Sequence, residues 1–187
     1  MQKQAGEAGN RSPRVVLVGM MGSGKTTVGR LVAARLGSEF ADTDEEVESR
    51  AGISVQEVFA SCGEEAFRRS ETEALEVLLA HGGPGVVAVG GGAVLSDSNR
   101  QVMQREATVV WLKASVGTLT DRVGTGEGRP LLADRPLVAL DTTRDRLAAL
   151  AGERKRLYED VSAVAIDTDG LSPEEVAELV VSAVVHP

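Results

Sequence analysis

A glycine-rich segment near the start of the chain has the chemistry of a phosphate-binding loop (P-loop). Its residues fit the pattern Gly-x4-Gly-Lys-Thr and read Gly19-Met20-Met21-Gly22-Ser23-Gly24-Lys25-Thr26, followed by Thr27. The backbone N–H groups of such a loop surround an anion, and the start of the following helix adds partial positive charge. Lys25 can reach the β- and γ-phosphates of a nucleotide, and the Thr26 hydroxyl can ligate Mg²⁺. A glycine-rich turn without function accounts poorly for the complete pattern.

Two acidic residues, Asp42 and Asp44, follow the second predicted strand. Aspartate is favoured at the N-cap and in the first turn of a helix, so the pair could simply start a helix. Beside a P-loop the two carboxylates can do more. One of them can hold a water molecule of the Mg²⁺ shell, and the other can accept hydrogen bonds from the hydroxyl group that receives phosphate.

Arg68 lies between two glutamates at helical spacing, with Glu64 four residues before it and Glu71 three residues after it. This spacing is typical of ion pairs on a solvated helix face. The functional interpretation is that Glu71 orients Arg68 toward a carboxylate of the substrate. The planar guanidinium group suits that task, because it can donate two parallel hydrogen bonds to one carboxylate.

Three consecutive glycines, Gly90, Gly91 and Gly92, follow the apolar run Val86-Val87-Ala88-Val89. They would let a ligand approach bare backbone, where an N–H could donate to a substrate oxygen. The alternative is a tight turn, for which one or two glycines suffice. The run does not end in an acidic residue, which P-loop switches and motors usually place there for Mg²⁺. This difference disfavours a switch or a motor.

Two further arginines are candidates for binding anions. Arg129 lies in the segment 124–136, which is rich in Gly and Arg, lacks an apolar period and is long enough to form a mobile lid. A lid arginine would neutralise charge on the γ-phosphate and exclude water, although an exposed loop arginine is the simpler alternative. Arg154 lies near a predicted helix end, where the helix dipole favours cations in any case.

Five short apolar runs alternate with helical patterns and must position these residues. We predict strands at 14–19, 39–41, 86–89, 108–112 and 163–166. Helices are predicted at 25–36, 43–50, 55–60 and 64–80, from about 97, from about 115 and from about 141 to 158. A last helix follows Ser172 with the apolar stripe Val176, Leu179, Val180, Ala183 and Val184. The alternation predicts a three-layer α/β fold around a five-stranded parallel sheet, with ligands at the carboxyl ends of the strands.

The composition is that of an ordinary globular protein. The chain has 187 residues, of which 42% are hydrophobic and 26% charged, and its length fits one domain at about 100–200 residues per domain. We expect residues 1–12 to be a flexible tail and residues 13–187 to be a single domain. The 28 acidic and 20 basic residues give a net charge of −8, which disfavours a surface for polyanions. The lone Cys62, the lack of an apolar N-terminal stretch and the lack of a run of about 18 apolar residues predict a cytoplasmic protein that binds neither nucleic acid nor membrane.

The ordered set of motifs resembles the shikimate kinase family. The resemblance covers about Arg14 to Val181 and consists of Gly-Met-Met-Gly-Ser-Gly-Lys-Thr-Thr, Asp-Thr-Asp, Phe-Arg-Arg-x-Glu, Gly-Gly-Gly-Ala, Arg-Pro-Leu-Leu and Arg-x-x-Leu-Tyr. It implies a nucleoside-monophosphate-kinase-like fold. It also implies ATP-dependent phosphorylation of the 3-hydroxyl of shikimate, a step toward chorismate and the aromatic amino acids.

We expect the protein to be a monomer. The resemblance also implies a role for each matching position. Shikimate would be bound within about 43–72 and by the later motifs, through Asp44, Phe59, Phe67, Arg68, Gly90, Gly91, Gly92 and Arg154. ATP would be bound by Gly22, Ser23, Gly24, Lys25, Thr26, Thr27, Arg122 and Arg129, with Arg122 packed on adenine and residues 167–170 completing the adenine wall. Mg²⁺ would be held by Thr26 and Asp42, and the catalytic residues would be Lys25, Asp44 and Arg129.

Two rival functions stay open from the sequence alone. One is another small-metabolite kinase of the same fold, such as a gluconate kinase. The other is a regulatory or structural module that binds a nucleotide without an acceptor. The set of Asp44, Arg68 and Arg154 and the missing acid at the strand end disfavour the second rival, and a nucleotide acceptor would leave two arginines aimed at a carboxylate unexplained. The first rival stays open.

Overall fold

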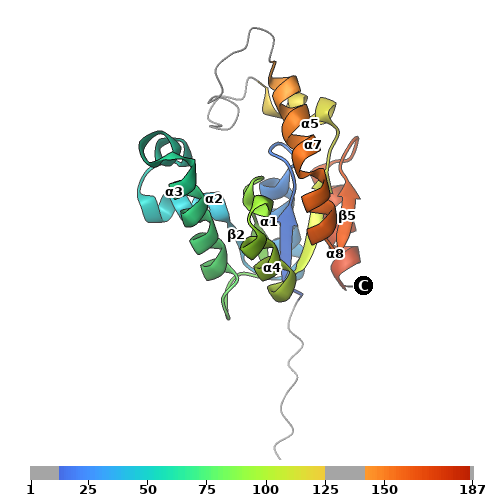
Figure 1. Ribbon diagram of the computed structural model, residues 1–187. Coiled ribbons are helices and arrows are strands. Elements are labelled where there is room, and N and C mark those ends of the chain that lie inside the picture. The colour runs from blue at the N-terminus through green and yellow to red at the C-terminus, as the bar shows by residue number, and fades with distance from the viewer. Residues whose placement is uncertain (1–12, 125–141, 186–187) are drawn as a thin grey trace, which may run out of the picture.

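Five parallel strands form the centre of the computed structural model, which describes residues 13–124 and 142–185 (Figure 1). The strands occur in the order β2-β3-β1-β4-β5. Their bounds are β1 Val15–Val18, β2 Phe40–Asp42, β3 Val86–Ala88, β4 Thr108–Lys113 and β5 Val164–Asp167. The predicted fold class and parallel sheet are thus confirmed. The predicted tail, the predicted lid apart from Gly124, and Arg129 lie outside the described residues.

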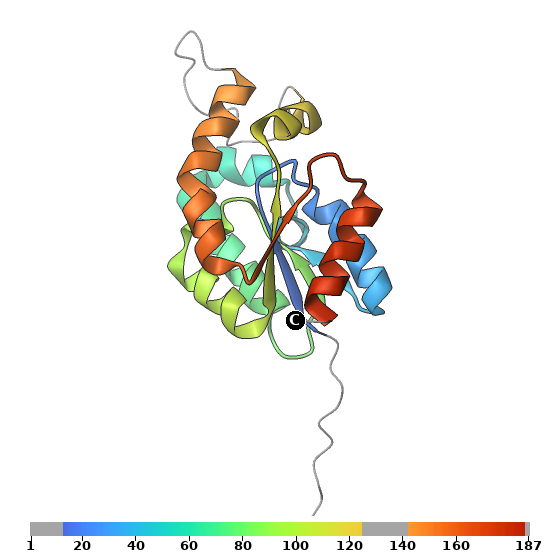
Figure 2. The ribbon, with the colours of Figure 1, turned by 90° about the vertical axis from the view of Figure 1, so that its right-hand side faces the viewer.

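Helices cover both faces of the sheet, as Figure 2 shows with the sheet nearly edge-on. On one side lie α1 and α8, and on the other lie α3, α4 and α7. The bounds are α1 Lys25–Leu36, α2 Thr43–Ala51, α3 Val55–Leu78, the 3-10 helix η1 Ala93–Leu95, α4 Asp97–Glu106, α5 Val116–Val123, α7 Thr143–Val161 and α8 Pro173–Val185. The architecture therefore has three layers, with α2 and the first part of α3 at one side of the molecule.

Strand β1 explains why the central runs are wholly apolar. Side chains alternate across a strand, so Val15 and Leu17 enter the core beneath α1 and α8, whereas Val16 and Val18 enter the core beneath α3, α4 and α7. All four are fully buried. A parallel strand covered on both faces must be apolar at every position, which is the pattern that predicted it.

The apolar stripe of α8 differs by one residue from the prediction. Val176, Val180 and Val184 are buried as expected, but Leu179 is 47% exposed and Ala177 is buried in the core instead. Ala177 belongs to the same cluster as Ala33 of α1. The buried face of α8 is therefore formed by Val176, Ala177, Val180 and Val184, and Leu179 lies outside it.

Helix α3 contains the two helices that were predicted at 55–60 and 64–80, joined across a kink. The helix runs from Val55 to Leu78 and contains one residue with non-helical geometry, Gly63, at φ 81° and ψ 171°. Only glycine adopts this backbone without strain. The predicted break between two helices is therefore confirmed, and Gly63 is the residue at which they join.

Two smaller features complete the fold. Strand β2 lies one residue later than predicted, because Asp42 still pairs with Ala88 of β3 while Glu39 only accepts a hydrogen bond from Val86 N. Within the described ranges, 13–124 and 142–185, no helix combines the length and apolar character needed to cross a membrane.

Candidate active site

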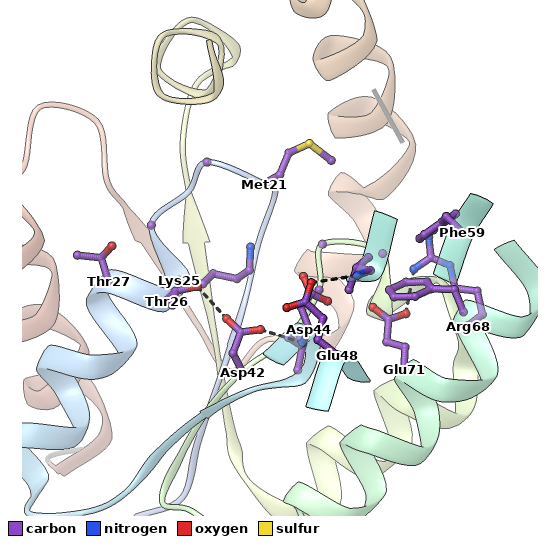
Figure 3. Close-up of a pocket in the computed structure, with 18 of the residues that line it drawn as sticks. Met21, Lys25, Thr26, Thr27, Asp42, Asp44, Glu48, Phe59, Arg68 and Glu71 are labelled. Atoms are coloured by element: carbon purple, nitrogen blue, oxygen red, sulfur yellow. Dashed lines mark hydrogen bonds and ion pairs between the residues drawn. The ribbon is translucent and has the colours of Figure 1, made fainter. Parts of the chain in front are cut away.

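A cavity of about 710 Å³ opens at the carboxyl ends of the strands, between the P-loop and helix α3 (Figure 3). Most of the residues predicted for the site line it: Gly22, Gly24, Lys25, Thr26, Thr27, Asp42, Asp44, Phe59, Phe67, Arg68, Gly90, Gly91, Gly92 and Arg122. Ser23 and Arg154 lie outside this lining. The topology therefore brings the phosphate motif and the predicted acceptor motifs to one place.

The P-loop has the conformation that its glycines predict. Gly19, Gly22 and Gly24 have positive φ angles of 147°, 81° and 92°. No side chain caps the start of α1, so its first N–H groups can face an anion. Lys25 Nζ donates hydrogen bonds to the carbonyl oxygens of Gly19 and Met20, at 2.9 and 3.0 Å, and so lies along the loop.

Ser23 differs from its neighbours in the P-loop. Its side chain is buried, and its backbone N–H donates to Met20 O at 3.1 Å. A side-chain contact to a nucleotide is therefore not part of this conformation. The buried Ser23 hydroxyl has no hydrogen-bond partner in the described structure.

The Thr26 hydroxyl donates to Asp42 Oδ2 at 2.8 Å, which brings the two predicted metal ligands together. The other oxygen, Oδ1, accepts from the backbone N–H of Asp44 at 3.0 Å and caps α2. Asp42 thus starts a helix and faces Thr26 at the same time, so the capping role is confirmed and the role at Mg²⁺ stays a prediction. Hydroxyl and carboxylate oxygens are ligands that fit Mg²⁺. Among the described residues no group of three His, Cys, Asp or Glu side chains could hold a metal by itself, so the nucleotide and water would have to complete the coordination.

Arg68 is held by a buried partner. Its Nη1 donates to Glu71 Oε2 at 2.9 Å, and its Nη2 donates to Glu64 Oε1 at 3.2 Å. Glu71 is only 1% exposed, whereas Glu64 is exposed. The interpretation as a solvated ion-pair face therefore fails for Glu71. The Arg68 guanidinium also lies over the Phe67 ring, 5.3 Å from its centre, and so has little freedom to turn.

Asp44 can exchange a proton near neutral pH. Its Oδ1 atom is enclosed and has no hydrogen-bond partner in the described structure. Burial, together with the nearby carboxylates of Asp42 and Glu71, raises the pKa of Asp44 to about 7 against the opposing effect of Lys25. Burial also raises the pKa of Glu71, opposed by Arg68.

The three glycines after β3 provide room for charged side chains. None has a positive φ angle, so a turn does not require them. A Cβ atom on Gly90 would collide with Glu71 Oε1 and lie 3.0 Å from Asp44 Oδ1, and a Cβ atom on Gly92 would collide with the Arg68 guanidinium. The interpretation as a tight turn is therefore incomplete, because bare backbone is needed for close approach.

The backbone N–H of Gly90 already has a partner. It donates to the buried Thr43 hydroxyl at 3.0 Å. The predicted N–H donor to a substrate oxygen would therefore have to be Gly91 or Gly92, not Gly90.

Phe59 and Phe67 form one wall of the cavity, with ring centres 4.5 Å apart. Eight residues along a straight helix would separate them by about 12 Å. The non-helical Gly63 lies midway between them and bends α3, which allows the rings to meet. The glycine therefore shapes the wall without lining it.

Arg122 and Arg154 occupy different surroundings. Arg122 links the P-loop to the segment after β5, through hydrogen bonds to Gly22 O at 3.5 Å and to Thr168 Oγ1 and O at 3.3 and 3.2 Å. That is the place predicted for adenine. Arg154 is 2% exposed and donates from Nη1 to Gly91 O at 3.1 Å, so it lies behind the glycine backbone in this structure.

The motif analysis did not include Glu48, which also lines the cavity. Its Oε1 accepts from the backbone N–H of Val55 at 2.9 Å and so joins α2 to the start of α3. The signal for it was its spacing, because Glu48 follows Asp44 by one helical turn and so shares its face. Together with Asp42, Asp44 and Glu71 it gives the described lining four carboxyl groups against three cationic side chains. Burial is the main cause of the raised pKa of Asp44 and of Glu71, and the neighbouring carboxylates Asp42, Glu71 and Glu48 add to the effect at Asp44.

Comparison with known proteins gives a consistent result. A family model described as shikimate kinase matches residues 21–185. The shikimate kinase of Symbiobacterium thermophilum is 48% identical over 162 residues, which cover 87% of this chain and 90% of that protein. The structure of shikimate kinase from Acinetobacter baumannii in complex with shikimate superposes with a TM-score of 0.85 at 33% identity, covering 92% of this chain and 93% of that one.

A structure of a gluconokinase from Sinorhizobium meliloti bears on the rival function. It covers 93% of this chain and 92% of its own, with a TM-score of 0.60 at 17% identity, and so shares the fold alone. The family match and the relatives of higher identity decide between the two. The chain belongs to the shikimate kinase family of ATP-dependent phosphotransferases.

Proposed function

We propose that the cavity is the active site in which the γ-phosphoryl group of ATP is transferred to the 3-hydroxyl of shikimate. The observation that carries the proposal is the arrangement along the cavity. The P-loop lies at one end, the guanidinium of Arg68 lies at the other, and the Asp44 carboxyl lies between them. An acceptor with a carboxylate at one side and hydroxyl groups at the other would span this distance in one orientation.

The P-loop end is suited to a triphosphate. Its positive-φ glycines and the uncapped start of α1 offer backbone N–H groups, and Lys25 is anchored beside them. Thr26 and Asp42 would hold Mg²⁺, Thr26 directly and Asp42 through water. The bound ion would supply positive charge against the phosphate oxygens. Arg122 would pack on adenine, and Arg129, in the predicted lid, would add charge at the γ-phosphate.

The acceptor end is suited to a hydroxylated carboxylate. Arg68, fixed by Glu71 and by the Phe67 ring, would bind the carboxylate together with Arg154. Phe59 and Phe67 would bound the ring of the acceptor. Asp44 would accept a hydrogen bond from the attacking hydroxyl, hold it in line with the γ-phosphate, and take up its proton late in the transfer.

The test is the dependence of ADP formation on the acceptor. Purified protein with MgATP is given shikimate, gluconate or a nucleoside monophosphate, and ADP release is followed in a coupled assay. Turnover is expected with shikimate at about 1–100 per second, the range of kinases, and at background with the other two. ATP binding without turnover on any acceptor would revive the regulatory module, and turnover on gluconate alone would revive the rival kinase.

A further inference from the structure

Tyr158 and Arg154 hold the same backbone carbonyl. The Tyr158 hydroxyl donates to Gly91 O at 2.6 Å, and Arg154 Nη1 donates to the same oxygen at 3.1 Å. The two residues lie one helical turn apart on α7 and are 1% and 2% exposed. A carbonyl with two such donors cannot rotate without losing both.

The orientation of this carbonyl sets the orientation of the next N–H. The described residues contain no cis peptide bond, and in a planar trans peptide the C=O and the following N–H point in opposite directions. Because Gly91 C=O points toward α7, the N–H of Gly92 points away from α7. Gly92 lines the cavity and lies against the Arg68 guanidinium. The α7 contacts therefore determine how a backbone donor is presented beside Arg68.

Tyr158 is itself fixed. Its ring stacks on Trp111, with ring centres 5.5 Å apart and an angle of 21° between the planes. The hydroxyl also approaches Met20 Sδ in the P-loop, at 3.7 Å. Burial raises the pKa of Tyr158 to about 12, so the hydroxyl keeps its proton and stays a donor at any working pH.

We propose that Tyr158 is a positioning residue of the acceptor site, which together with Arg154 fixes the Gly91–Gly92 peptide so that the Gly92 N–H is presented beside Arg68, where the acceptor's carboxylate binds. Tyr158 acts through these groups and does not touch the reacting atoms. The inference rests on the proposed function, since the carboxylate is that of shikimate. The inference gives a role to the Tyr158 hydroxyl, which takes no part in phosphate binding or in phosphoryl transfer.

The test is Tyr158→Phe, which keeps the ring on Trp111 and removes only the hydroxyl. We expect the KM for shikimate to rise about tenfold, within the range that one lost hydrogen bond produces, with kcat and the KM for ATP within about twofold. With the methyl ester of shikimate, which lacks the charged carboxylate, the variant and the wild type should differ by less than about twofold. The matched control is Ser162→Ala, one turn further along the chain. It also removes one hydroxyl, which donates to Tyr158 O at 2.7 Å and does not line the cavity.

The outcomes separate the possibilities. An unchanged KM for shikimate in Tyr158→Phe would overturn the inference, as would an equal effect on shikimate and its ester or a matching rise in the KM for ATP. A variant that fails to fold would also overturn it, because the hydroxyl would then serve stability. A wild-type protein without shikimate-dependent turnover would reject the proposed function and, with it, this inference. A wild type active on shikimate with an unaffected Tyr158→Phe variant would reject the inference alone.

Discussion

Substitution of Gly92 by alanine tests the acceptor end of the cavity through a single added methyl group. Gly92 has φ −98°, an angle that alanine adopts without strain. The new Cβ atom would lie 2.7 Å from Arg68 Cζ and nearer still to the two terminal nitrogens. The backbone can therefore stay in place, and the flexible end of Arg68 must move.

The size of that movement predicts the effect. Carbon atoms in contact normally lie about 3.5 Å apart or more, so the guanidinium must shift by roughly 1 Å. Its bond to Glu71, at 2.9 Å, would lengthen by a similar amount and leave the buried carboxyl poorly paired. A misplacement of about 1 Å can lower a rate about 100-fold. We therefore expect kcat/KM for shikimate to fall about 100-fold in Gly92→Ala, while the KM for ATP stays within about twofold.

The assay is ADP release at varied shikimate and at varied ATP, with melting temperatures to check the fold. Gly152→Ala is the matched control, because a Cβ atom there meets nothing within 4 Å. Gly152 lies inside α7, so alanine should stabilise the protein by up to about 1 kcal/mol without changing either KM. If Gly92→Ala keeps the wild-type KM for shikimate, the assigned role of Arg68 is refuted. If the variant loses as much affinity for ATP as for shikimate, Arg68 is not confined to the acceptor end of the cavity.

Three further substitutions address the P-loop, the buried acid and the guanidinium fork. Lys25→Met should lower kcat by at least about 1,000-fold with the melting temperature nearly unchanged, and residual transfer near the wild-type rate would contradict its role. In Asp44→Asn the raised pKa is removed. The folded wild type binds a proton that the unfolded chain releases between pH of about 3.8 and about 7, so its stability falls across that window. The melting temperature of Asp44→Asn minus that of the wild type should therefore increase from pH 4 to pH 8. If this difference in melting temperature does not change with pH, Asp44 does not carry a buried charge at the higher pH. Arg68→Lys should raise the KM for shikimate about 10- to 100-fold, because an ammonium group cannot make the paired hydrogen bonds, and an unchanged KM would contradict the assignment of the carboxylate.

The fold was predictable because its central elements carry local signals. Strand β1 is buried on both faces and so is apolar throughout, which distinguishes it from an amphipathic segment. Ser172 and Glu175 mark the start of the last helix in the sequence, and they form reciprocal hydrogen bonds in the structure. The position of Leu179 was not predictable in this way, because the side chains on α1 decide which face of α8 is buried.

The site was predictable only in part, for a related reason. Lys25 and Asp42 lie in motifs whose chemistry depends on residue type and spacing along the chain. The burial of Glu71 and the shared carbonyl of Gly91 depend on contacts between distant segments. Arg154 and Tyr158 lie 63 and 67 residues from the carbonyl that they hold, and no short-range pattern reports such a contact.

The bend in α3 suggests how acceptor preference could be altered by moving a residue instead of exchanging one. Each residue in a helix turns the following side chain by about 100° around the axis. Shifting Gly63 by one position would therefore point Phe59 in a different direction while Phe67 and Arg68 stay anchored. The wall formed by Phe59 and Phe67 would change its shape with the P-loop untouched. The place of one glycine within a helix is thus a variable for redesigning the acceptor range of this enzyme.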